Sequence, residues 1–252
     1  MSIENYILSP SSLNLFLKEP ALWVMKYFYG IRGEGSIYTM RGKLVEDRVN
    51  QIIEGSQQYS FYKHCLSEIL LDTDNIEIRE QDLKDFEKWG NYAYNCLPKE
   101  LNIHSIVSMQ RHVKTVIKGV TVGGYIDYEY PECIVDLKTT NKLPIICSRG
   151  ERKDMISKTK VDNVRQQVVY HLATKKTIKL LYVTPTDHLL YTITQRDIEE
   201  VMPSILEGIK KIKKCLTLKK EDAILHIQPE KTNSFYWTDK LREEARKIWN
   251  IK

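Results

Sequence analysis

Two aspartates and a lysine lie on neighbouring predicted strands, where they could surround a divalent cation. β-branched and aromatic residues dominate both strands, and turn residues between them predict a hairpin. The strands and their turn read Gly124-Tyr125-Ile126-Asp127, Tyr130-Pro131-Glu132-Cys133 and Ile134-Val135-Asp136-Leu137-Lys138-Thr139-Thr140. Residues two apart in a strand face the same way, so Asp136 and Lys138 should project together near Asp127. A metal held by the carboxylates would explain these charges, and a solvated cross-strand ion pair is the alternative.

A third carboxylate could come from a helix predicted over residues 38–54. Its apolar positions have helical spacing, and Gly42 and Glu46 are four residues apart on one face. A glycine inside a helix lowers the stability of the helix by about 1 kcal/mol relative to alanine. One reason for a glycine at such a position is that it lets another backbone or a ligand come close. Glu46 is therefore a candidate ligand, with an ordinary surface carboxylate as the alternative.

A helix predicted from Val164 to Ala173 adds polar groups. Gln166 and Tyr170 are four apart on one face, and Arg165 lies next to them. The preceding segment, residues 141–162, is polar and basic, which predicts a loop beside the site. Five of its side chains are candidates for phosphate contact, or for an ordinary solvated surface. They are Arg149, Arg152, Lys153, Lys158 and Lys160.

The composition is that of a globular protein, with 42% hydrophobic and 28% charged residues among 252. Lysine and arginine (38) exceed aspartate and glutamate (33) by five, which is compatible with a polyanionic partner. No apolar run approaches the roughly 20 residues of a membrane span, and the first residues do not resemble a signal peptide. The five cysteines are scattered without a Cys-x-x-Cys pair. This pattern fits a protein of the reducing cytoplasm and argues against a structural zinc site or a disulfide framework.

The other predicted elements form a helical first part, a strand-rich centre and a helical end. We expect a helical region over 1–103, a core over 104–195 and further helices over 196–252 packed on the core, all within one domain. The tail sequence Phe235-Tyr236-Trp237 could stack bases or pack onto the domain. The remaining predictions are helices over 9–29, 59–71, 80–97 and 197–216, and strands over 105–140, 179–184 and 189–194.

The order of these motifs resembles the RecB-like branch of the PD-(D/E)XK nucleases. The resemblance runs from about residue 9 to residue 195, and each motif is loose while their order is demanding. The matching segments are Gly42-Lys43-Leu44-Val45-Glu46, Gly124-Tyr125-Ile126-Asp127, Val135-Asp136-Leu137-Lys138-Thr139-Thr140 and Gln166-Gln167-Val168-Val169-Tyr170. The resemblance implies an α/β, restriction-endonuclease-like fold, in which a mixed central β-sheet is flanked by helices and the N-terminal region is helical. Relatives of this kind that lack an iron–sulfur cluster include the mitochondrial genome maintenance exonuclease and phage exonucleases.

The resemblance also implies roles for individual residues. Mg²⁺ or Mn²⁺ would be bound by Glu46, Asp127 and Asp136 with the Leu137 backbone carbonyl. Lys138 would orient or activate the attacking water, and Gln166 and Tyr170 would position DNA and the site. Many members have histidine in place of Glu46, and a carboxylate still suits these cations.

Iron–sulfur members of the family have a cysteine just before the proline of the first helix pair. This chain has Glu19 before Pro20, and the clustered C-terminal cysteines of those members are missing. We therefore expect no iron–sulfur cluster.

The resemblance implies a metal-dependent DNA exonuclease that acts on single strands or DNA ends. Basic residues of the 149–160 loop and of the stretch 210–214 would follow the phosphate backbone without reading bases. The expected partner is DNA, without a membrane, and a recombination or replication protein is a candidate partner. A structure-selective endonuclease and a non-catalytic DNA-binding module of the same fold are the alternatives.

Overall fold

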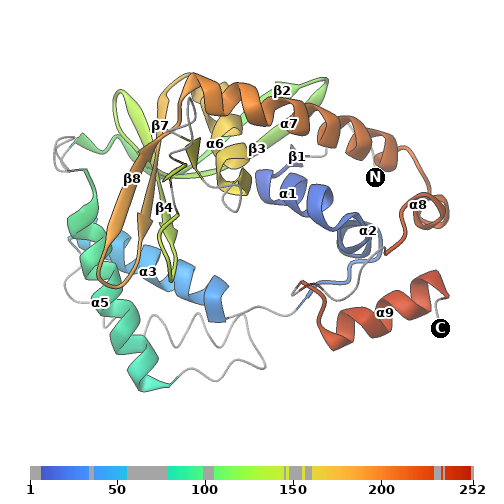
Figure 1. Ribbon diagram of the computed structural model, residues 1–252, viewed down its shortest axis with the longest axis horizontal. Coiled ribbons are helices and arrows are strands. Elements are labelled where there is room, and N and C mark those ends of the chain that lie inside the picture. Colours follow the sequence, from blue (N-terminus) through green and yellow to red (C-terminus); the bar gives the residue numbers. More distant parts are fainter. Residues whose placement is uncertain are drawn as a thin grey trace.

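A computed structural model describes residues 7–33, 37–55, 79–98, 105–144, 146–147, 155–156, 161–229, 234 and 236–250. It shows an α/β fold, in which helices flank a six-stranded mixed sheet (Figure 1). The helices are α1 (Pro10–Lys18), α2 (Pro20–Phe28), α3 (Ile37–Ile53), α5 (Glu80–Cys96), α6 (Val161–Thr174), α7 (Gln195–Leu216), α8 (Lys220–His226) and α9 (Asp239–Trp249). The strands are β1 (Ile7–Leu8), β2 (Ser108–Ile117), β3 (Val120–Glu129), β4 (Cys133–Thr139), β5 (Ile146–Cys147), β6 (Met155–Ile156), β7 (Thr177–Val183) and β8 (His188–Thr192).

The sheet has the strand order β1-β3-β4-β7-β8, and β2 also pairs with β3. The β2–β3, β3–β4 and β7–β8 pairs are antiparallel, whereas β4 and β7 are parallel. A parallel pair needs a crossover connection, and this one contains α6. The register of β4 and β7 places Asp136 beside Leu180 and Lys138 beside Tyr182.

Hydrophobic clusters cover both faces of the sheet. Ile134 and Tyr182 belong to a first cluster with residues of α1, α6 and α7. Val135 and Leu137 belong to a second cluster with residues of α3 and α5. Side chains alternate between faces along a strand, so Asp136 projects from β4 toward the first cluster. Figure 1 shows α3 and α5 on one side of β4 and α6 on the other. The sheet thus separates the two helical layers, and charged residues of β4 face the α6 layer.

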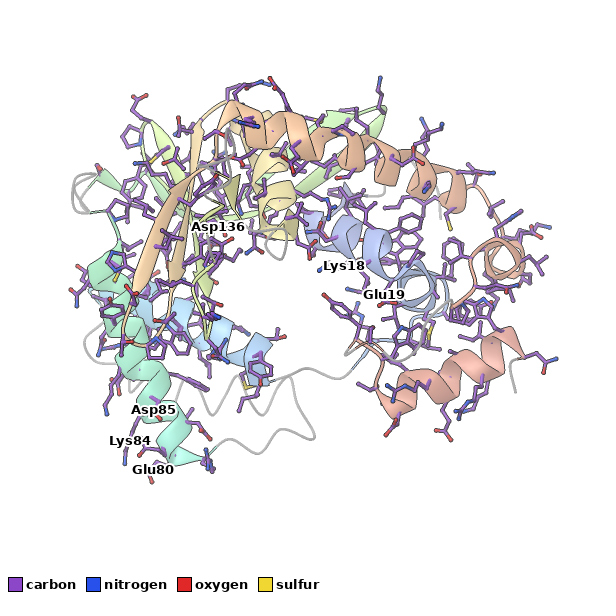
Figure 2. The ribbon with its side chains drawn as sticks, viewed as in Figure 1. Lys18, Glu19, Glu80, Lys84, Asp85 and Asp136 are labelled. Atoms are coloured by element: carbon purple, nitrogen blue, oxygen red, sulfur yellow. The ribbon has the colours of Figure 1, made fainter. Side chains whose placement is uncertain are left out.

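The N-terminal helix pair also anchors the C-terminal part of the chain. Ser9 caps α1, because its Oγ accepts a hydrogen bond of 3.1 Å from the Ser12 amide, and Pro10 is the first helical residue. Glu19, at the junction of α1 and α2 (Figure 2), accepts hydrogen bonds from Ser234 Oγ at 2.7 Å and Trp237 Nε1 at 3.0 Å. Trp237 is buried against α2, so this tail aromatic packs onto the domain. Phe235 lies outside the described residues.

The predicted helices and strands agree with the structure where both can be compared, with boundaries that differ by a few residues. The prediction of a loop over 141–162 is wrong in part, because this segment contains the paired strands β5 and β6 and the first residues of α6. The helix predicted over 38–54 spans Ile37–Ile53, and the one predicted from Val164 begins three residues earlier. The helix predicted over 59–71 lies outside the described residues. None of the described helices is long and apolar enough to cross a membrane.

Candidate active site

The strands β3 and β4 part at the two aspartates. Their ladder pairs Tyr128 with Val135 and extends in the other direction, toward the hairpin turn. At the point of parting, the backbone N–H of Leu137 donates to Asp127 Oδ2 at 2.8 Å. The Asp127 carboxylate therefore replaces a ladder acceptor that the separated strand no longer supplies. This hydrogen bond holds the Asp127 carboxylate beside the β4 backbone at the residue that follows Asp136.

Near Asp127, the β2–β3 ribbon also changes which side of the sheet its buried side chains face. Val113 and Ile126 pack in the first cluster, whereas Met109 and Tyr128, farther along the two strands, pack against the second. A regular strand would keep residues two or four apart on one face. The break coincides with Gln110, whose φ of 51° is uncommon for a residue other than glycine. Such backbone outliers are enriched at functional sites. Gln110 lies on β2 between the residues that pair with Tyr128 and Ile126, the two neighbours of Asp127 on β3.

Asp136 and Lys138 form a buried ion pair on the α6 side of the sheet. Lys138 Nζ lies 2.6 Å from Asp136 Oδ2, and Asp136 is fully buried. Beyond this ion pair, neither Asp136 oxygen accepts a hydrogen bond from the described part of the chain. Burial alone would lower the pKa of Lys138, but Asp136 and Asp127 raise it above its usual value. Lys138 therefore stays an ammonium, fixed beside a carboxylate that has spare acceptor capacity.

Glu46 faces the aspartates from α3. Burial raises the pKa of Glu46 to about 7, with a further contribution from Asp136, while Lys138 opposes the shift. Burial likewise raises the pKa of Asp127, together with the charges of Asp136 and Glu46. The three predicted ligands are thus electrostatically coupled to one another and to Lys138.

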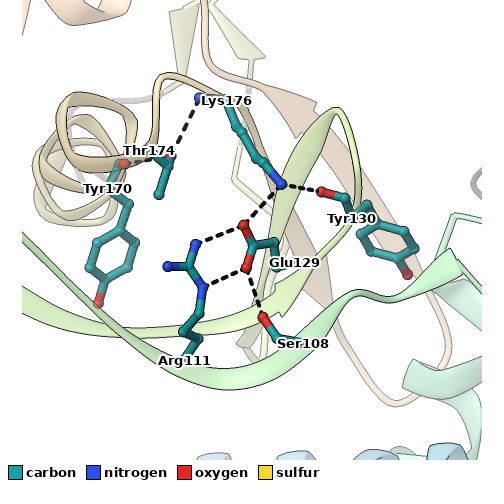
Figure 3. Close-up of polar contacts among 7 residues, drawn as sticks. All are labelled: Ser108, Arg111, Glu129, Tyr130, Tyr170, Thr174 and Lys176. Atoms are coloured by element: carbon teal, nitrogen blue, oxygen red, sulfur yellow. Dashed lines mark hydrogen bonds and ion pairs between the residues drawn. The ribbon is translucent and has the colours of Figure 1, made fainter.

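Gln110 touches this group directly, since its side-chain amide donates to Glu46 Oε1. Its neighbours Ser108 and Arg111 are both held by the carboxylate of Glu129, as Figure 3 shows. Ser108 Oγ donates at 2.7 Å, and the Arg111 guanidinium makes two contacts of 2.6 and 2.7 Å. Glu129 also pairs with Lys176 at 2.9 Å, which ties this clamp to the segment after α6. The clamp fixes the chain on both sides of Gln110, a residue that alternation in a strand did not single out.

The α6 residues approach the same region. Gln166 Nε2 donates to Tyr170 Oη at 3.1 Å, which matches their predicted common face. Burial raises the pKa of Tyr170 to about 12, helped by the charge of Asp136. A Cβ on Gly124 would lie 2.8 Å from Tyr170 Oη, so glycine is needed there for the close approach of α6. Across the sheet, a Cβ on Gly42 of α3 would be 3.6 Å from the Thr139 Oγ1.

Other predicted site residues are placed elsewhere or not described. Arg165 contacts Ser204 of α7 through Nε at 2.8 Å and Asp162 through a second nitrogen at 3.0 Å. Its predicted DNA contact stays a prediction. The five loop residues Arg149, Arg152, Lys153, Lys158 and Lys160 lie outside the described residues. Within the described ranges, no group of three or more His, Cys, Asp and Glu side chains is arranged to hold a metal ion. The side chains of Glu46, Asp127 and Asp136 are engaged instead with Gln110, Leu137 and Lys138.

Comparisons with known proteins support the fold. A proposed exonuclease from Eubacterium rectale, known from its crystal structure, is similar over 96% of this chain and 92% of its own, with a TM-score of 0.61 and 15% identity. The match to a second solved structure, SSO0001, covers 78% of this chain and 84% of that chain at 12% identity, with a TM-score of only 0.29. No protein-family model matches the chain, and no curated protein matches it in sequence.

Proposed function

We propose that the protein is a metal-dependent DNA exonuclease of the RecB-like branch of the PD-(D/E)XK nucleases. The observation that carries the proposal is the buried pair of Asp136 and Lys138, beside two more carboxylates of raised pKa, at the point where β3 and β4 part. The similarity to a proposed exonuclease of the same fold supports this assignment. The sequence motifs imply a restriction-endonuclease-like mixed sheet flanked by helices, and the six-stranded mixed sheet agrees with that architecture.

The charge of the site fits Mg²⁺ or Mn²⁺. Three carboxylates repel one another, and buried Asp136 accepts no hydrogen bond from described residues beyond its ion pair with Lys138. Such a group suits a hard cation that prefers oxygen ligands. Glu46, Asp127 and Asp136 would hold it, with the Leu137 carbonyl. Each of these carboxylates now has a protein partner, so we expect cation binding to release Lys138 from Asp136 or Gln110 from Glu46.

The protein's own groups account for much of the chemistry that phosphodiester hydrolysis needs. The Lys138 ammonium supplies fixed positive charge where the phosphate gathers negative charge in the transition state. Tyr170 and Gln166, joined by their hydrogen bond, border this charge from α6 and would position the DNA. A bound divalent cation would polarise the phosphoryl oxygen and lower the pKa of a coordinated water.

A time course on labelled DNA tests the proposal. Linear single strands and duplexes with a label at either end should be degraded with Mg²⁺ or Mn²⁺ and stay intact with EDTA. A circular single strand should survive, because an exonuclease requires an end. Cutting of the circle would instead assign a structure-selective endonuclease. Binding without hydrolysis of any substrate would assign a non-catalytic module.

The variant Lys138→Ala separates binding from chemistry. It removes the charge that we assign to transition-state stabilisation, so hydrolysis should fall by at least about 100-fold, the loss typical of one such electrostatic group. DNA binding, measured by fluorescence anisotropy, should persist. Undiminished hydrolysis in this variant would refute the assigned mechanism.

A further inference from the structure

The outer face of the β2–β3 hairpin is exposed although it carries large apolar side chains. Val116 is 68% exposed and Tyr125 is 61% exposed. The opposite face of the hairpin is buried in the first cluster through residues such as Val113 and Val122. Exposed aromatic and aliphatic groups that share one strip commonly mark an interaction site. The outer face of the hairpin is therefore a candidate binding surface for a ligand or partner.

Tyr125 is paired with an aromatic neighbour on this face. It lies directly opposite His112 in the β2–β3 register, and their ring centroids are 5.0 Å apart with an interplanar angle of 56°. This contact restrains the Tyr125 ring while most of its surface stays exposed. The next pair along the ribbon is Lys114 with Gly123, and Gly123 adds no side chain beside the ring. An ammonium-bearing side chain and an open space thus adjoin an aromatic surface.

The position of this surface links it to the candidate active site. Tyr125 precedes Asp127 by two residues in β3, a separation of about 7 Å along a strand. Its partner His112 follows Gln110 by two residues in β2. The neighbouring Gly124 faces the other way, toward Tyr170. The aromatic pair therefore lies two residues along the ribbon from the point where the strands part, on the face opposite α6.

The charge of the hairpin favours a polyanion. From Ser105 to Ile126 the chain has no acidic residue and three basic ones. Arg111 is held by Glu129, so the charge offered to a polyanion is that of Lys114 and Lys118. An aromatic ring beside cations is the arrangement that single-stranded nucleic acids use, because every base has a face that can stack. A base inside a duplex has no free face to offer. A protein partner would need roughly 800 Å² on each side, whereas this strip is one strand pair wide.

We propose that Tyr125, supported by His112, forms a stacking platform for an unpaired base of single-stranded DNA next to the phosphate that is cut. The proposal rests on the proposed nuclease function and adds a substrate class and a subsite to it. Stacking on the ring would hold the strand along the outer face of the hairpin, so that the neighbouring phosphate lies toward Asp127, where β3 and β4 part. The subsite accepts any base, because stacking does not read hydrogen-bonding edges.

Binding of a fluorescein-labelled single-stranded oligonucleotide in EDTA tests the platform. Loss of one stacked ring should weaken binding by about 5- to 100-fold in Tyr125→Ala, whereas Tyr125→Phe should bind within about twofold of wild type. The KM measured with Mg²⁺ should rise by the same factor in Tyr125→Ala. Leu225→Ala, which truncates a side chain that is 72% exposed on α8, is the matched control and should change neither quantity.

An abasic scan of the oligonucleotide identifies the stacked base. Removing that base should weaken binding to the wild-type protein by the factor seen in Tyr125→Ala, and should cause no further loss in the variant. Unchanged affinity and KM in Tyr125→Ala, while wild type hydrolyses DNA, would overturn the platform and leave the nuclease intact. Self-association lost in Tyr125→Ala, with DNA affinity unchanged, would overturn it in favour of a protein interface. A wild-type protein that neither binds nor cuts DNA would overturn both proposals.

Discussion

The substitution Glu46→Gln should stabilise the metal-free protein. Glu46 is partly buried, and this burial, with a smaller contribution from the negative charge of Asp136, raises its pKa from 4.5 to about 7. The native state therefore binds a proton more tightly than the unfolded chain does. Stability from this group is complete below pH 4.5 and is lost as the pH rises through about 7. A glutamine keeps an oxygen that can accept the hydrogen bond from Gln110 and removes only the charge.

The size of the effect follows from the shift in pKa. A difference of about 2.5 units at 1.36 kcal/mol per unit sets an upper limit of about 3 kcal/mol. Local relaxation reduces it, so we expect a gain of about 1–3 kcal/mol in the free energy of unfolding at pH 8, falling to about zero at pH 4. In a chain of this size the gain corresponds to roughly 2–12 °C in Tm.

Thermal unfolding in EDTA across this pH range, followed by circular dichroism, measures the effect. Saturating Mg²⁺ or Mn²⁺ should reverse the order of the two proteins, because a bound cation stabilises the native state and Glu46→Gln removes a charged ligand. A variant that is less stable than wild type in EDTA at pH 8 would refute the electrostatic reasoning. An equal response of both proteins to the cation would show that Glu46 does not bind it.

Three further substitutions test the surroundings of the site. Glu129→Gln removes a carboxyl whose pKa is lowered to about 2, chiefly by its hydrogen bonds from the Arg111 guanidinium. Urea unfolding should therefore show a free energy of unfolding that is about 1–3 kcal/mol lower in the variant above pH 4.5, and this difference should disappear as the pH falls through about 2. A difference that does not depend on pH would contradict this reasoning. Gly124→Ala should lose about 1–3 kcal/mol through overpacking against Tyr170 Oη, and Tyr170→Phe should restore part of it; no restoration would contradict the contact. Gln110→Ala should raise the pKa of Glu46 in an NMR titration of the metal-free protein, because its hydrogen bond lowers that pKa; an unchanged titration would exclude the contact in solution.

The sequence predicted the parts of the site that depend on regular geometry. Strand alternation is enough to place Asp136 and Lys138 on one face, where they form an ion pair. Helical spacing is enough to bring Gln166 and Tyr170 into hydrogen-bond contact. Both predictions use only the periodicity of one element, which local sequence determines.

The parts that the sequence did not predict depend on departures from regular geometry. The bond from the Leu137 amide to Asp127 exists because two strands separate, and strand propensity carries no signal for that separation. Gln110 reaches Glu46 from a left-handed backbone position that nothing in its residue type demands. Arg165 is the exception, because regular helical geometry rotates it by about 100° from Gln166, and it contacts Ser204 of α7.

We propose that the carboxylates where β3 and β4 part perform metal-dependent hydrolysis of DNA. The most direct test compares single-turnover hydrolysis of a labelled single strand by wild type and by Asp136→Asn, with circular dichroism to confirm equal folding. We expect hydrolysis by wild type with Mg²⁺ or Mn²⁺ and none with EDTA, and a loss of at least about 100-fold in the variant, as for other single electrostatic groups in active sites. Hydrolysis by Asp136→Asn at the wild-type rate, or wild-type hydrolysis that persists in EDTA, would contradict the account.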